Sequence, residues 1–163
     1  MENPDRPHSP LLVPVLLALA AAAVATIPFA RADAPQAGGG PYTIKETGKT
    51  FGKLQEAVDA IGTGTGTIMI APGLYHDCAV QTAGDVSYVA EQVGKVVFDT
   101  TICEDKGAIV MRGYNANVSG ITFQNMNSKY SGNAVGVRME KGNLTVAQSW
   151  FKDSQQGILA GDD

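Results

Sequence analysis

Two stretches, Asn115-Ala-Asn-Val-Ser-Gly-Ile-Thr-Phe-Gln-Asn125 and Asn143-Leu-Thr-Val-Ala-Gln-Ser-Trp-Phe-Lys-Asp153, decide the fold, because they are one pattern written twice. They align without a gap at an offset of 28 residues, and apolar, polar and turn positions recur in the same order. Such recurrence is typical of stacked structural repeats. We therefore expect Phe123 to stack on Phe151 in the core. The matched polar positions are expected at corners, where Asn and Asp tolerate left-handed backbone: Asn115, Asn143, Asn125 and Asp153.

Short apolar segments recur around these two copies at offsets of 23 to 28 residues. No helical pattern separates them, and few two-residue hairpin signals occur, which argues against a β-sandwich. Parallel strands that stack turn upon turn fit the spacing better. The predicted strands are 42–44, 68–70, 78–80, 86–89, 96–98, 108–111, 134–139 and 157–161, with a Gly/Thr turn over 62–67.

One helix is predicted, over 50–61, with Thr50 as its N-cap and Gly62 as its end. Its apolar positions fall on a single face: Phe51, Leu54, Val58 and Ile61. A short amphipathic helix of this kind can cover one end of a stacked β structure, which needs such a cap for solubility.

The N-terminus reads as a signal peptide over 1–32. Leu11 to Phe29 is almost wholly apolar, and Ala30-Arg-Ala32 is a small-x-small cleavage pattern. An uncleaved membrane anchor is the competing interpretation, because the apolar run nearly reaches the ~20 residues that span a bilayer. Residues 33–47 are expected to form a linker and a first short strand. The sequence thus predicts an exported protein, periplasmic or extracellular, which meets the membrane only if the N-terminal segment stays uncleaved.

Charge and cysteine content narrow the partners and the compartment. The formal net charge is -4 with no basic cluster, which argues against a nucleic-acid partner. Cys78 and Cys103 are the two cysteines, and an even pair in an exported protein is more often a disulfide. Their spacing is close to one repeat, and stacked strands ~4.8 Å apart suit a disulfide. The alternative is two buried small hydrophobic side chains.

Two further motifs carry a resemblance to a known fold. Thr50 to Ala60, followed by Thr67-Ile-Met-Ile-Ala-Pro-Gly-Leu-Tyr75, resembles the opening of pectin-lyase-like right-handed parallel β-helix proteins, and Val118 to Asn125 is similar to their repeat. The resemblance implies an all-β fold over 48–163, a right-handed parallel β-helix with an N-terminal capping helix. It implies no single activity, because the superfamily includes lyases, hydrolases, esterases and proteins of unknown activity.

The carboxylates that close the chain are the first catalytic candidates. Gly161-Asp162-Asp163 is similar to the Gly-Asp-Asp of polygalacturonase-type hydrolases, in which paired carboxylates protonate the leaving group and activate water. The other motifs of those enzymes are missing here. Asp162 and Asp163 are therefore weak candidates.

Arg112 and Arg138 are the second pair of weak candidates, since they lie 26 residues apart and could share one face. In pectate-lyase-like enzymes an Arg serves as base while carboxylates bind calcium. Calcium would need several converging oxygens, and Asp99, Glu104 and Asp105 are the acidic cluster available. A solvated turn is the favoured interpretation of that cluster, so no metal site is predicted and no cofactor is evident, with calcium kept as an option.

His76 is expected to be a turn residue, because one His and one Cys give too few ligands for zinc. The sequence thus predicts an exported β-helix that binds or acts on polysaccharide, as a lyase, hydrolase or esterase. The alternative is a non-catalytic structural or adhesion module of unknown ligand. A third expectation is that the chain lacks its C-terminal coils, because no cap follows the last strand.

Overall fold

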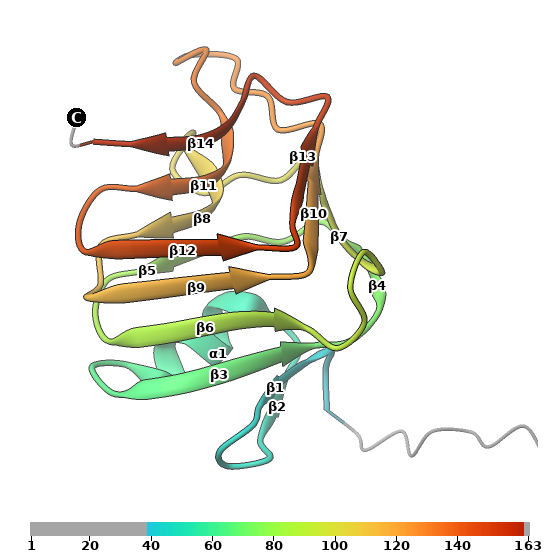
Figure 1. The fold of residues 1–163 in the computed structure, drawn as a ribbon, viewed down its shortest axis with the longest axis vertical. Coiled ribbons are helices and arrows are strands. Elements are labelled where there is room, and N and C mark those ends of the chain that lie inside the picture. Colours follow the sequence, from blue (N-terminus) through green and yellow to red (C-terminus); the bar gives the residue numbers. More distant parts are fainter. Residues whose placement is uncertain (1–38, 162–163) are drawn as a thin grey trace, which may run out of the picture. The chain divides into compact units, whose positions relative to one another are not determined.

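The computed structural model describes residues 39–161, in which short strands pair mainly in parallel register and form three sheets around a shared core (Figure 1). Sheet A has the order β12 (Asn143–Ala147), β9 (Asn115–Ser119), β6 (Asp85–Ala90), β3 (Thr65–Ile70), β1 (Tyr42–Ile44) and β2 (Thr50–Phe51). Sheet B has the order β13 (Trp150–Lys152), β10 (Ile121–Gln124), β7 (Val96–Asp99) and β4 (Gly73–Tyr75). Sheet C has the order β14 (Gln156–Ala160), β11 (Val135–Met139), β8 (Gly107–Met111) and β5 (Ala79–Gln81).

The chain visits the three sheets in turn, so that each triplet of strands lies on the triplet before it. β3, β4 and β5 are followed by β6, β7 and β8, then by β9, β10 and β11, and then by β12, β13 and β14 (Figure 1). Only β1 pairs antiparallel, with β2 and β3. The described chain is therefore mostly β with parallel sheets, as predicted.

The alignment of the two copies is confirmed by the strand register. Asn143 pairs directly with Asn115 in sheet A, and Phe151 pairs with Phe123 in sheet B. The rings of Phe123 and Phe151 stack with centroids 5.2 Å apart and an interplanar angle of 8°. Parallel register places identical sequence positions on one another, which is why a 28-residue repeat becomes a vertical row of like side chains.

An aromatic column runs through the core beside sheet B. It continues through every triplet, with neighbouring ring centroids 5.2–5.7 Å apart, and consists of Tyr42, Tyr75, Phe98, Phe123 and Phe151. Offset and tilted ring pairs at this distance add to the stabilisation from burial alone. One buried polar side chain also faces the core: Gln81 donates to the carbonyls of Gly84 and Asn115 and accepts from the Tyr88 hydroxyl.

The helix α1 (Leu54–Ile61) begins later than the sequence predicts. Thr50 is not its N-cap, because Thr50–Phe51 forms β2 and pairs with β1. Lys53 takes the N-cap position, and the Asp77 carboxylate accepts from the Leu54 amide at 2.9 Å. The predicted end at Gly62 is confirmed by its positive φ of 60°. α1 buries Leu54, Ala57 and Val58.

Three strand predictions need correction. β3 begins at Thr65, so the predicted turn over 62–67 is shorter, and β5 begins at Ala79 rather than at Cys78. β4 was not predicted, because Ala71-Pro-Gly73 reads as a turn. Pairing of Gly73–Tyr75 with β7 extends that segment into a strand.

The corner prediction is right for one pair of residues and wrong for the other. Asn125 and Asp153 have φ values of 57° and 51° and follow β10 and β13. Asn115 and Asn143 instead begin strands β9 and β12. Their side chains form a ladder along sheet A, in which Asn143 donates to Asn115 and Asn115 donates to Asp85.

The predicted disulfide between Cys78 and Cys103 is present, with the two Cα atoms 5.6 Å apart. It joins the residue before β5 to the loop between β7 and β8. A disulfide is consistent with an exported protein. Within residues 39–161, we find no helix of the length and apolar character needed to span a membrane. The predicted signal peptide lies outside the described residues.

Candidate functional site

The outer face of sheet C gathers charged side chains from two neighbouring strands. Arg138 lies on β11, and Arg112 directly follows β8. The register pairs Met139 with Met111, so Glu140 emerges beside Arg112. The structure therefore brings the two predicted arginines together through a carboxylate that sequence reasoning missed.

Glu140 is the centre of this group. Lys106 and the Arg112 Nε both donate to its carboxylate, and the Arg138 Nε lies 4.0 Å from Oε1. Arg112 also forms a two-pronged ion pair with Glu104. We call these five residues the charged cluster: Glu104, Lys106, Arg112, Arg138 and Glu140.

Both carboxylates of the charged cluster are held ionised. Hydrogen bonds from Arg112 lower the pKa of Glu104. Burial would raise the pKa of Glu140, but hydrogen bonds from Lys106 and Arg112 outweigh burial and lower it. The two carboxylates in turn raise the pKa of Arg112. At neutral pH neither Glu104 nor Glu140 is a proton donor, and Arg112 is not a base.

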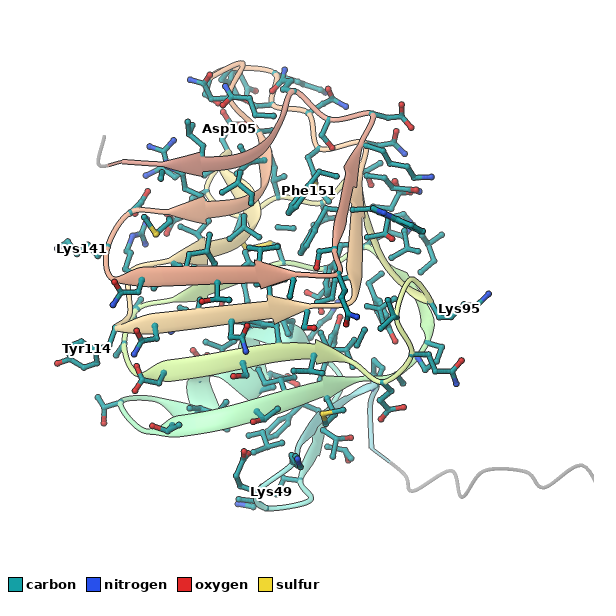
Figure 2. The ribbon with its side chains drawn as sticks, in the orientation of Figure 1. Lys49, Lys95, Asp105, Tyr114, Lys141 and Phe151 are labelled. Atoms are coloured by element: carbon teal, nitrogen blue, oxygen red, sulfur yellow. A yellow bond between two sulfur atoms is a disulfide. The ribbon has the colours of Figure 1, made fainter. Side chains whose placement is uncertain are left out.

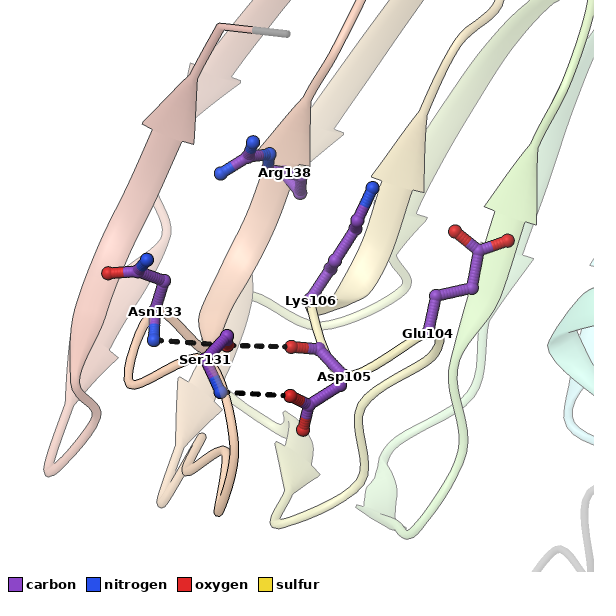
Figure 3. A pocket seen from close by; sticks show the side chains of 6 residues that line it. All are labelled: Glu104, Asp105, Lys106, Ser131, Asn133 and Arg138. Carbon is purple, nitrogen blue, oxygen red and sulfur yellow. Dashed lines mark hydrogen bonds between the residues drawn. The ribbon is translucent and has the colours of Figure 1, made fainter. Parts of the chain in front are cut away.

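A pocket of about 110 Å³ opens beside the charged cluster (Figure 3). Its lining combines two acidic, two basic and two neutral polar side chains: Glu104, Asp105, Lys106, Ser131, Asn133 and Arg138. The formal charges in this lining balance. The pocket therefore offers both hydrogen-bond donors and acceptors without a strong net field.

The loop between β10 and β11 forms one wall of the pocket, and side chains of neighbouring triplets hold it. The Asp105 carboxylate accepts from the Ser128 hydroxyl at 2.6 Å and from the Ser131 amide at 3.1 Å (Figure 3). Gln155 accepts from the amides of Ser128 and Ala134 and donates to the Ser128 carbonyl. The loop is thus fixed before any ligand arrives, which lowers the entropic cost of binding.

Tyr130 stands at the outer end of this loop and is 90% exposed. Its amide donates to the Ser128 hydroxyl, so its backbone is held while its ring faces solvent. Nothing in the sequence pattern marks Tyr130, because the loop lies outside the repeating positions. An exposed aromatic ring next to a polar pocket is a common feature of ligand-binding surfaces.

The acidic residues considered for calcium do not converge. Asp99 accepts from the Asn125 side chain at 2.7 Å, whereas Glu104 pairs with Arg112 and Asp105 holds the loop. Within residues 39–161, no group of three or more His, Cys, Asp or Glu side chains could hold a metal ion.

The remaining predicted candidates lie away from the pocket or beyond the described chain. The His76 Nδ1 lies 3.0 Å from the Asp99 carbonyl and 3.2 Å from the Thr100 hydroxyl, which fits a turn residue. Asp162 and Asp163 lie outside the described residues, so the structure does not place them. Cys103 directly precedes Glu104, and its disulfide anchors the segment that carries three of the pocket residues.

Comparisons with known proteins give no relative for this chain: no family model, curated protein or solved structure matches it.

Proposed function

We propose that this protein is an exported right-handed parallel β-helix, related to the pectin-lyase-like superfamily, that binds polysaccharide. The threefold cycle of the chain through sheets A, B and C supports the β-helix. Right-handed connection is the rule for parallel strands. α1 packs against β1, β2, β3 and β5 and would serve as the N-terminal cap. The disulfide supports export, since disulfides persist in oxidising compartments.

The pocket on sheet C is the proposed binding site. The observation that carries the proposal is a preorganised polar pocket with an exposed aromatic ring at its rim. Sugar hydroxyl groups donate to carboxylates such as Glu104 and accept from amides such as Asn133. The apolar face of a pyranose ring can pack on Tyr130. The balanced charge of the lining favours an uncharged polysaccharide over a polyuronate.

Binding is favoured over glycoside hydrolysis by the ionisation of the carboxylates. A hydrolase needs one carboxylic acid that is still protonated at the working pH. The lowered pKa values of Glu104 and Glu140 work against that role.

The test is a calorimetric titration of the purified chain with soluble oligosaccharides, both uncharged and uronate-containing. Tyr130→Ala should weaken binding roughly 5- to 30-fold, equivalent to one or two kcal/mol. Tyr114→Ala is the matched control, because Tyr114 is also exposed, at 70%, and does not line the pocket. Equal losses from both variants would contradict the pocket as the site.

A parallel assay tests catalysis directly. Polyuronates incubated with the chain, with and without calcium, would yield ultraviolet-absorbing unsaturated ends under a lyase and new reducing ends under a hydrolase. We expect neither product. A clear yield of either would replace the binding role with an enzymatic one, and no binding to any sugar would favour the structural or adhesion module.

A further inference from the structure

Trp150 is an exposed aromatic side chain on a different face of the molecule, the outer side of sheet B. It lies in β13, and 66% of its surface is exposed. Its neighbour Phe151 points inward and stacks on Phe123. Because successive side chains of a strand point to opposite faces, Trp150 points outward.

The indole lies across the neighbouring strand instead of standing away from it. Trp150 pairs with Thr122 of β10, and Thr122 is only 4% exposed although it too faces outward. The indole also reaches the loop before β7, since a Cβ on Gly94 would lie 3.6 Å from the Trp150 Cζ3 atom. One part of the ring system therefore rests on β10 and Gly94, and the rest forms a flat open surface.

A row of hydrogen-bonding side chains runs beside this surface. Asp99, Gln124 and Lys152 pair with one another across β7, β10 and β13, so they form a column one outward position further along. Asn125 holds the Asp99 carboxylate in place. Parallel strands space the members of such a column ~4.8 Å apart, and positions two residues apart on a strand are separated by ~6.6 Å.

We propose that Trp150 and the polar row Asp99, Gln124 and Lys152 form a second glycan-binding surface, which takes a pyranose ring on the indole. The polar row would then bond hydroxyl groups of the same chain of sugars. The choice of a glycan as ligand rests on the proposed function, but the surface itself is independent of the pocket on sheet C.

A glycan fits this surface better than a protein partner. Stable protein interfaces bury about 800 Å² on each partner and have an apolar centre. Here the exposed apolar side chains nearest to the indole reduce to Val93, which borders Gly120, and charged side chains lie close by. A single flat ring flanked by hydrogen-bonding groups suits a sugar, whose own surface alternates in the same way.

The experiment uses the fact that Trp150 is the one tryptophan of the chain. Its fluorescence therefore reports on this surface alone. We would titrate the full chain with soluble uncharged oligosaccharides and record the emission spectrum and quenching by acrylamide. The expected result is a saturable change in emission and protection of the indole from acrylamide, which persist in Tyr130→Ala.

Calorimetry with two variants completes the test. Trp150→Ala should weaken binding of longer oligosaccharides roughly tenfold, while Trp150→Phe, which keeps a ring, should retain most of the affinity. Trp150 is largely exposed, so both variants should fold, which far-ultraviolet circular dichroism would verify.

The outcomes separate this inference from the proposed function. Sugar binding that leaves Trp150 fluorescence and quenching unchanged, and that Trp150→Ala does not weaken, would overturn the second surface and leave the pocket standing. Loss of binding in Trp150→Ala with none in Tyr130→Ala would support the second surface and remove the pocket. An absence of binding to every sugar would overturn both.

Discussion

Glu140 is the side chain on which the charged cluster depends, because three cationic groups face it. Replacement by Gln should reduce the free energy of unfolding by about 1.5–3 kcal/mol, since hydrogen bonds to charged groups contribute that much and the cations would then repel one another. Urea denaturation measures the change. Glu91→Gln, at an exposed position, is the control. A loss no greater than that of the control would show that the ion pairs contribute no net stability.

The same cluster predicts how stability depends on pH. The pKa values of Glu104 and Glu140 are lowered in the folded chain from an ordinary value of 4.5. A lowered pKa means that the folded state binds fewer protons, so the stabilisation is present above the ordinary pKa and is lost as pH falls through the folded value. The free energy of unfolding should therefore fall below about pH 4.5, and fall less steeply in Glu140→Gln. Parallel curves for the two proteins would contradict this assignment.

At this scale the sequence predicted position better than partnership. The repeat correctly suggested that Arg112 and Arg138 share a face. Glu140 lies at the same 28-residue offset from Arg112 that relates Asn143 to Asn115, so extending the alignment would have found it. Tyr130 could not be found in this way, because its loop has no counterpart in the earlier triplets and its position depends on contacts with Asp105 and Gln155.

Among the elements, the aromatic column gives the sharpest contrast between the middle and the edge of the fold. Phe123 is fully buried between Phe98 and Phe151, whereas Phe151 is only partly buried. Phe123→Ala should destabilise the chain by about 3–5 kcal/mol, the usual cost of emptying a buried aromatic site. Phe151→Ala should cost less. Chemical denaturation compares them, and equal losses would mean that the edge position is as well packed as the middle.

The disulfide is predicted to stabilise the loop that carries Glu104, Asp105 and Lys106. It closes a segment with a sequence separation of 25 residues. Restricting the unfolded chain over such a loop contributes roughly 3–4 kcal/mol. The double variant Cys78→Ser with Cys103→Ser should lose that much in denaturation experiments and should exchange amide hydrogens faster over 100–106. Unchanged exchange there would show that the strands alone fix the loop.

Elements were predictable where local pattern and pairing agree. The alternating segments of β6, β9 and β12 satisfy both, so they were found. Gly73–Tyr75 follows Pro72, and only its pairing with β7 makes it a strand. Thr50 has the chemistry of an N-cap, but β1 recruits it into a strand. Long-range pairing overrode local preference in both cases, and a single sequence does not reveal such pairing.

In the molecule as a whole, protection should decrease from the middle triplets toward β12, β13 and β14. These strands pair on one side only, and their inward apolar residues, such as Leu144 and Val146, are only partly buried. Amide exchange tracks local opening, which is easiest where few buried contacts hold a segment. Exchange followed by mass spectrometry should show these strands as the fastest of the strands in β6 to β14. Uniform protection would contradict this expectation.

The register of the triplets also sets a ruler. Because Asn143 lies on Asn115 and Phe151 on Phe123, a duplication of residues 115–142 would meet the same neighbours above and below that the existing copy meets. Each such duplication would lengthen the stack by one strand spacing, ~4.8 Å, and leave the width of every sheet unchanged. Growth of this kind adjusts the reach of a binding face in fixed steps, without redesign of the core.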